Sequence, residues 1–167
     1  KESWLWVSRS GWNISRSHDT ILYLFYDADM PDNNEFVGVT GSSPAQQVWD
    51  PAFMAVYHMN NGADDSHIYD STSNGNNGLK IGGNGVSSEV TGAAGRAQLF
   101  DGIDDYIDIG SECASITTDL TIEAFINSTT PGPPAKALFS TRQGDDNTLP
   151  YELGLATSGT PYFRLGG

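Results

Sequence analysis

Residues Gly95 to Ile109 read Gly-Arg-Ala-Gln-Leu-Phe-Asp-Gly-Ile-Asp-Asp-Tyr-Ile-Asp-Ile, and this stretch is the most informative part of the chain about its fold class. Two short apolar runs, residues 97–100 and 106–109, flank a turn around Gly102. Glycine supplies the positive φ of a tight turn, and Asp side chains accept hydrogen bonds from nearby backbone N–H groups. The pattern predicts a β-hairpin with carboxylates at its tip. These carboxylates are Asp101, Asp104 and Asp105.

The composition of the whole chain also favours β structure. Among its 167 residues are 19 Gly, 15 Asp and 11 Asn, which belong in turns rather than in long helices. The hydrophobic content of 38% is sufficient for a core. With 21 acidic and 8 basic residues the formal charge is −13, which disfavours nucleic acid and anionic membrane surfaces as partners. An all-β protein is therefore predicted.

Strand signals recur along the chain at spacings of about ten residues, as in a β-sandwich or barrel. No segment predicts a helix longer than about two turns by the 3.6-residue period. The expected strands are residues 3–8, 20–26, 36–39, 54–59, 78–81, 87–90, 97–100, 106–109, 120–126, 137–141, 151–156 and 161–165.

The turn-rich stretch 40–44 predicts a boundary between two domains. Residues 1–48 form a β-rich segment that we interpret as the C-terminal part of a preceding domain. Residues 49–167 form the second domain, which opens at Trp49-Asp50-Pro51. Residue 1 begins in the middle of a strand-like pattern, so we expect an excised segment.

Residues from about 53 to 167 resemble LamG-like, concanavalin A-type jelly-roll domains. Four motifs in family order carry the resemblance. They are Ala55-Val-Tyr-His-Met59, Asp70-Ser-Thr-Ser-Asn-Gly-Asn-Asn-Gly78, Phe100-Asp-Gly-Ile-Asp-Asp-Tyr106 and Leu120-Thr-Ile-Glu-Ala-Phe-Ile126. Residues 1 to about 50 are similar to the C-terminal end of a domain of unknown function common in prokaryotic surface proteins.

The resemblance implies an antiparallel jelly-roll β-sandwich that is incomplete at its C-terminus, because family members continue with further strands. A sandwich without those strands exposes an unpaired sheet edge, and self-association through that edge is then expected. It also implies an extracellular or cell-surface location, which includes a virion surface.

A calcium site is the best-motivated chemistry, since Ca²⁺ takes six to eight oxygen ligands from Asp, Asn and backbone carbonyls. The resemblance implies that the 70–78 loop and the 101–105 turn come close together and bind the ion. The candidate ligands are Asp70, Asn74, Asn76, Asp101 and Asp104. The alternative is that Asp70 and Asp101 only cap turns through their own backbone.

Glycan binding on this fold uses aromatic platforms with Asp and Asn side chains around them. The candidate platforms are Tyr69, Tyr106, Tyr151 and Tyr162, each of which has core packing as its alternative role. The sequence does not choose among them, so the ligand-binding residues stay unknown.

Catalysis has little support. Enzymes on this fold use a Glu-x-Asp-x-x-Glu strand, whereas residues 120–126 offer Glu123 alone. None of His18, His58 and His67 lies in a hydrolase or metalloprotease motif. The single cysteine, Cys113, allows no internal disulfide, and no apolar run reaches the length of a membrane span.

These observations predict a non-catalytic extracellular module for calcium-assisted glycan binding or adhesion, with a carbohydrate or a surface protein as partner. Two alternatives stay open. One is a structural or assembly module of a surface filament or appendage, and the other is an accessory domain of a polysaccharide-degrading enzyme.

Overall fold

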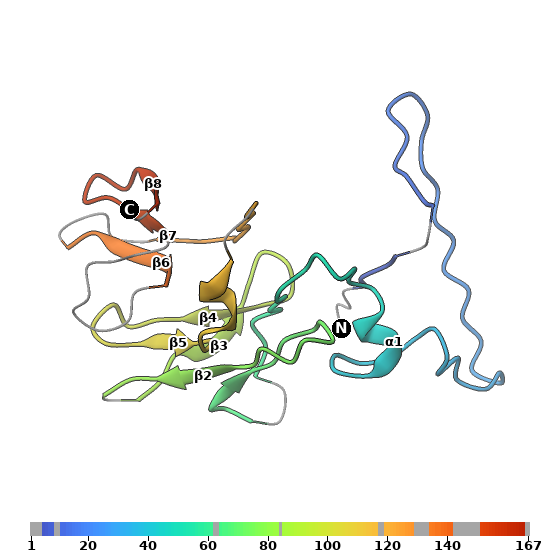
Figure 1. Cartoon of the computed structure of the whole chain (residues 1–167). Coiled ribbons are helices and arrows are strands. Elements are labelled where there is room, and N and C mark those ends of the chain that lie inside the picture. Colours follow the sequence, from blue (N-terminus) through green and yellow to red (C-terminus); the bar gives the residue numbers. More distant parts are fainter. Residues whose placement is uncertain are drawn as a thin grey trace. The chain divides into compact units, whose positions relative to one another are not determined.

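The computed structural model describes residues 5–8, 11–61, 64–83, 85–116, 119–128, 134–141 and 151–165. Within these residues the protein is all-β, with three antiparallel sheets and two four-residue helical turns (Figure 1). The elements are α1 (Ser43–Gln46), β1 (His67–Ile68), β2 (Gly78–Ile81), β3 (Ser88–Thr91), β4 (Arg96–Leu99), β5 (Tyr106–Asp108), the 3-10 helix η1 (Glu112–Ser115), β6 (Lys136–Ser140), β7 (Tyr151–Leu155) and β8 (Pro161–Leu165). The predicted fold class is confirmed, and the antiparallel sheets are consistent with a β-sandwich.

The chain divides into two compact units, Lys1–Asp108 and Ile109–Gly167. The predicted boundary at residues 48 and 49 lies within the first unit. In the first unit an aromatic cluster crosses that boundary. The ring of Trp6 stacks on His58 with 4.7 Å between centroids, and Trp49 packs edge-on against Phe53 at 5.3 Å.

The first unit contains a sheet of order β1-β2-β5 and the separate pair β3-β4. In the central strand β2, Leu79 pairs with His67 on one side and with Asp108 on the other. The interior is rich in polar side chains. The buried Lys80 donates from Nζ to the carbonyl of Ser87, and Gln98 donates from Nε2 to Asn61 Oδ1 and to the carbonyl of Met59.

The second unit contains the sheet β6-β7-β8, coloured orange to red in Figure 1. Its central strand β7 buries Tyr151 and Leu155, which are 2% and 8% exposed. The hydroxyl of Tyr151 donates to the carbonyl of Cys113, so η1 is joined to this strand. Cys113 is buried, and as the one cysteine of the chain it forms no internal disulfide.

The predicted hairpin over residues 97–109 is wrong. Strand β4 pairs with β3 from Ser88↔Leu99 to Thr91↔Arg96, whereas β5 pairs with β2. The true hairpin is β3-β4, whose turn is closed by a hydrogen bond from Gly92 N to Gly95 O at 2.9 Å. Residues 100–105 instead connect two different sheets. The turn at residues 92–95 brings β3 next to β4, so β3 is the partner of β4.

Four other expected strands are also corrected. Residues 5–8, 20–26, 36–39 and 120–126 form no strand, although residues 3 and 4 of the first lie outside the described part. Residues 54–59 contribute only an isolated bridge between Tyr57 and Asp70. A strand needs a paired neighbour, and none of the described residues supplies one for these segments. The remaining expected strands are confirmed to within one or two residues.

Candidate functional site

The three aspartates of the 101–105 loop form an acidic cluster in the structure. Asp101, Asp104 and Asp105 each offer a carboxylate oxygen, and these atoms all lie within 4.8 Å of one another. Oxygens that surround one Ca²⁺ at 2.3–2.6 Å are separated by up to about 5 Å, so the spacing suits that ion. Asp101 and Asp104 are exposed and Asp105 is half-buried, which leaves the cluster open to solvent.

Local hydrogen bonds fix the shape of this acidic loop. The Asp101 Oδ1 atom accepts from Ile103 N at 2.8 Å, and Asp105 Oδ2 accepts from Asp101 N at 3.0 Å. Within the described residues the Asp104 side chain makes no hydrogen bond. These turn contacts thus leave other carboxylate oxygens unused, namely one of Asp101, one of Asp105 and both of Asp104.

Two glycines after β2 allow the carboxylates to approach the backbone. A Cβ at Gly83 would lie 2.4 Å from Asp104 Oδ2, and a Cβ at Gly82 would lie 2.4 Å from Asp105 Oδ1 and 2.0 Å from the carbonyl of Gly85. Any larger residue would push these side chains away. Sequence reasoning missed this role, although the Gly-Gly pair directly after a predicted strand was the available signal.

The Asp70 loop has a different organisation. Asp70 is 4% exposed and its two carboxylate oxygens accept four hydrogen bonds. Oδ1 accepts from the backbone N–H groups of Val56 and Thr72, and Oδ2 accepts from Thr72 Oγ1 and Asn76 N. With two donors on each oxygen, the carboxylate is saturated by the protein itself.

The side-chain amides of Asn74 and Asn76 also stabilise the loop, through hydrogen bonds to the backbone. Asn74 Nδ2 donates to the carbonyls of Phe53 and Met54, and Asn76 Nδ2 donates to Met54. The register places this loop before Gly78, at the start of β2, whereas Tyr106 pairs with Ile81 at its end. The structure therefore places Asp70, Asn74 and Asn76 in one loop at the start of β2 and Asp101 and Asp104 in a second loop at its end.

The four tyrosines differ in exposure. Tyr106 directly follows the acidic loop and is 54% exposed, and Tyr69 is 38% exposed. Tyr151 is a core residue. Tyr162 donates to Glu152 Oε1 at 2.5 Å, and this hydrogen bond, followed by burial, raises the pKa of its hydroxyl. Tyr106 and Tyr69 both combine an exposed ring with a neighbouring carboxylate, since Tyr106 follows Asp105 in the chain and the Tyr69 hydroxyl donates to Asp64 Oδ2 at 3.4 Å.

A second cluster joins Asp64, Ser66 and His67. Ser66 Oγ donates to Asp64 Oδ1 at 2.6 Å, and His67 Nδ1 lies 2.6 Å from Asp64 Oδ2. The hydrogen bonds from Ser66, followed by that from His67, lower the pKa of Asp64 to about 2. Ser66 Oγ contacts the same ring nitrogen as Asp64, at 2.9 Å. A hydrolase triad needs serine and carboxylate on opposite ring nitrogens, so this cluster has turn-stabilising geometry.

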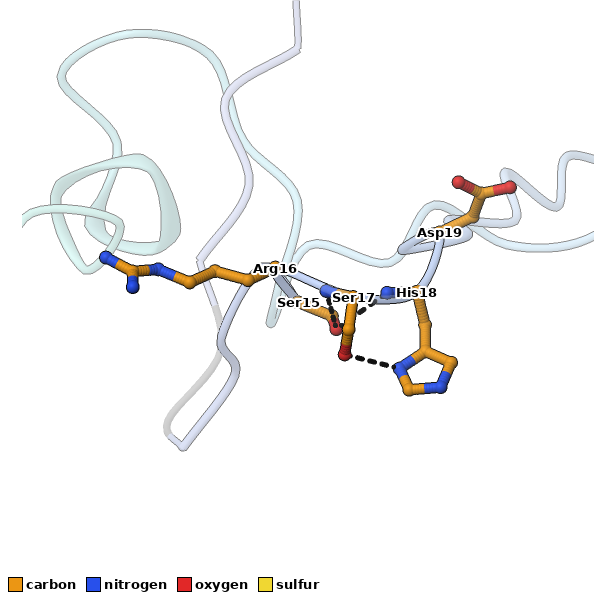
Figure 2. Close-up of a pocket in the computed structure, with 5 residues that line it drawn as sticks. All are labelled: Ser15, Arg16, Ser17, His18 and Asp19. Carbon is orange, nitrogen blue, oxygen red and sulfur yellow. Dashed lines mark hydrogen bonds between the residues drawn. The ribbon is translucent and has the colours of Figure 1, made fainter.

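Figure 2 shows another group of polar side chains, residues 15–19 of the N-terminal segment. Ser15 Oγ accepts from the backbone N–H groups of Ser17 and His18, and Ser17 Oγ lies 2.9 Å from His18 Nδ1. Asp19 points away from the imidazole in this view. No carboxylate of this group orients the histidine, and the arrangement is a serine-capped turn.

His58 is the third histidine and belongs to the aromatic cluster. Its ring packs against those of Trp6 and Trp49, at centroid distances of 4.7 and 5.9 Å, and the two indole rings also contact each other at 5.7 Å. Burial lowers the pKa of His58. The half-buried His58 ring therefore packs among other aromatic side chains.

Comparisons with known proteins give one similar structure. It is the 2.1 Å crystal structure of an S-layer domain-containing protein (residues 221–444) from Clostridium thermocellum ATCC 27405. The TM-score is 0.54 at 23% sequence identity, and the match covers 68% of this chain and 51% of that chain. This chain thus spans about half the length of that structure, and the likeness is one of fold.

No protein-family profile matches the chain, and no curated protein sequence matches it. Among the described residues, no helix has both the length and the apolarity needed to cross a membrane.

Proposed function

We propose that this chain is a non-catalytic recognition module of an extracellular or cell-surface protein, in which calcium bound at the acidic loop orders a face for glycan binding or adhesion. The observation that carries the proposal is the convergence of Asp101, Asp104 and Asp105, with ligand atoms within 4.8 Å. The S-layer domain in the similar protein's description supports a surface location.

The calcium ligands in this proposal are the three aspartates and not the Asp70 loop. Asp70 already accepts four protein hydrogen bonds, whereas Asp104 makes none within the described residues. Backbone carbonyls and water would complete the six to eight oxygens that Ca²⁺ requires.

The glycan would lie against Tyr106, because an exposed aromatic ring packs on the apolar face of a sugar while carboxylates accept from its hydroxyl groups. Tyr106 is 54% exposed and adjoins Asp105 in the chain. The specific fold that we propose together with this function is a LamG-like jelly roll.

The first test is a thermal melt in excess EDTA, followed by restored calcium or magnesium. Free calcium at 100 times its Kd stabilises the native state by about 2.7 kcal/mol. We expect a higher Tm with calcium, a smaller effect of magnesium, and no calcium effect in Asp104→Asn. This variant removes a carboxylate without removing a turn cap, since Asp104 makes no such bond within the described residues.

Asp29→Asn is the matched control, because it removes one exposed carboxylate from the N-terminal segment. It should leave the calcium response intact. An equal loss in both variants, or no calcium response in the unaltered protein, would leave the acidic loop as a set of turn caps. Retention of the protein on insoluble polysaccharides then tests glycan binding. Tyr106→Ala should weaken the retention, whereas the control variant Tyr26→Ala should not.

One observation favours a structural or assembly module as the second candidate. The sheet β6-β7-β8 has an outer edge on β8 to which no described residue pairs. An open edge of this kind joins chains by adding strands to a sheet.

A further inference from the structure

The sheet β1-β2-β5 has one buried and one exposed face. Side chains alternate along a strand, and paired residues of neighbouring strands share a face. The buried face carries Ile68 and Lys80, which are 1% and 4% exposed. The opposite face carries His67, Leu79 and Asp108, which the register places side by side across the three strands. Leu79 is 42% exposed and Asp108 is also exposed, so this second face is open to solvent within the described residues.

Two tyrosines lie on the exposed face, on its two outer strands. Tyr106 lies two positions before Asp108 in β5 and is 54% exposed. Tyr69 directly follows β1 and is 38% exposed, whereas its neighbours Ile68 and Asp70 are buried. This burial pattern continues the alternation of β1. Both tyrosine rings therefore lie on the exposed face.

Leu79 lies between the two tyrosines, on a diagonal line across the three strands. The β1-β2 register, continued by one residue, places Tyr69 opposite Asn77, two positions before Leu79. The β2-β5 register places Tyr106 opposite Ile81, two positions after Leu79. Diagonal neighbours of this kind are about 7–8 Å apart, so the line from Tyr69 through Leu79 to Tyr106 is about 15 Å long.

Polar side chains lie on both sides of this line. His67 and Asp108 flank Leu79 in the register. The Asp64 carboxylate accepts from the Tyr69 hydroxyl at 3.4 Å and lies 2.6 Å from His67 Nδ1. Imidazole nitrogens and carboxylate oxygens are suitable partners for the hydroxyl groups of a sugar.

The charge and the size of the face narrow the choice of ligand. Its carboxylates and the net charge of −13 repel an anionic polymer. A specific protein partner needs about 800 Å² of contact on each side, which a narrow line of three side chains does not supply. Separate aromatic rings with hydrogen-bonding groups beside them suit a chain of neutral sugars instead.

We infer that this face binds an extended chain of neutral sugars, with sugar rings stacked on Tyr69 and Tyr106 and the section between them over Leu79. A line of about 15 Å is longer than a disaccharide, so only a longer chain contacts both tyrosines. A ribbon-like β-1,4-linked chain fits best, because it is straight and a sheet face is nearly flat. This inference rests on the glycan binding proposed for Tyr106, to which it adds the class of glycan and the role of Tyr69.

The test is isothermal titration calorimetry of the full chain in calcium, with two pairs of neutral β-1,4-linked probes. The pairs are cellobiose with cellohexaose, and chitobiose with chitohexaose. At least one hexasaccharide should bind roughly tenfold or more tightly than its disaccharide, because only the longer chain reaches both tyrosines. This comparison uses the unaltered protein and does not depend on the folding of a variant.

Variants of Tyr69 then identify the second contact. Tyr69→Ala should weaken binding of the hexasaccharide roughly tenfold and remove its advantage over the disaccharide. Tyr69→Phe keeps the ring and loses only the hydroxyl that donates to Asp64, so it should retain most of the affinity. Tyr26→Ala is the matched control, since Tyr26 is an exposed tyrosine outside this sheet and should leave binding unchanged.

Three results would overturn the inference. They are no binding of either hexasaccharide, equal affinity for the short and long probes, and hexasaccharide binding that Tyr69→Ala does not change. Glycan binding that depends on Tyr106 but not on Tyr69 would overturn this inference alone. Failure to bind both the hexasaccharides and the insoluble polysaccharides would overturn the proposed glycan function as well.

Discussion

Asp70 organises the loop between β1 and β2 through a single side chain. Its carboxylate accepts from Val56 N at 3.0 Å, Thr72 N at 2.9 Å, Thr72 Oγ1 at 2.8 Å and Asn76 N at 3.0 Å. These bonds join residues up to 14 positions apart in the sequence. An ionised carboxylate suits this site because it only accepts hydrogen bonds.

Asp70→Asn should therefore destabilise the fold. The amide group would direct its own N–H donors at two N–H or O–H donors, and a buried donor without an acceptor costs about 1–3 kcal/mol. Chemical denaturation measures this loss. Asp27→Asn is the control, since Asp27 is exposed and caps only Asp29 N, and it should change stability by less than about 0.5 kcal/mol.

The Asp70→Asn loss should be the same in calcium and in EDTA. A loss that appears only in calcium would mean that Asp70 is a metal ligand, as the sequence pattern first indicated. The contrast with Asp104→Asn separates a structural carboxylate from a metal-binding one.

At the scale of elements, two segments with strongly strand-like sequence form no strand. In residues 20–26, every residue after Thr20 is aliphatic or aromatic. The exposed fraction of these residues reaches 89% at Phe25 and 90% at Tyr26. Residues 120–126 alternate in polarity, and Phe125 is 91% exposed. High β-propensity favours a strand only where a partner edge supplies the hydrogen bonds.

Segment 20–26 should consequently exchange its amide hydrogens fast. Its backbone has no strand partner among the described residues, whereas β7 is hydrogen-bonded on both sides. Hydrogen exchange measured by mass spectrometry at low protein concentration should show little protection for 20–26 and strong protection for Tyr151–Leu155. Equal protection of the two peptides would show that segment 20–26 is paired.

For the whole molecule, net charge opposes association. Each copy carries −13, so two copies repel each other at long range. Association through the β8 edge, the second candidate function, would be mostly apolar and backbone-mediated. Raising the salt shortens the screening length from about 20 Å near 20 mM to about 6 Å near 300 mM.

Association through β8 should therefore strengthen with salt. Sedimentation in EDTA at low and moderate sodium chloride measures the change, and the control variant Leu138→Lys, which changes an exposed residue of β6, should follow the unaltered protein. Weaker association at higher salt would mean that charge pairs, and not the apolar edge, hold the copies together.

Local sequence patterns were sufficient to predict the all-β class, most strand positions in residues 78–108 and 136–165, and the acidic loop. These features depend on local signals, namely alternation, glycine turns and runs of Asp, which act within a few residues of the chain. Asp101 and Asp104 lie together because they are only three positions apart in the chain.

The pairing of the strands and the role of each carboxylate became known from the three-dimensional arrangement of the chain. The turn at Gly92–Gly95 pairs β4 with β3, so residues 97–109 do not form a hairpin. Asp70 is saturated by donors as distant as Val56, and the register of β2 places it and Asp101 in loops at opposite ends of that strand. Strand pairing and burial join residues far apart in the chain, and a local pattern carries no information about such partners.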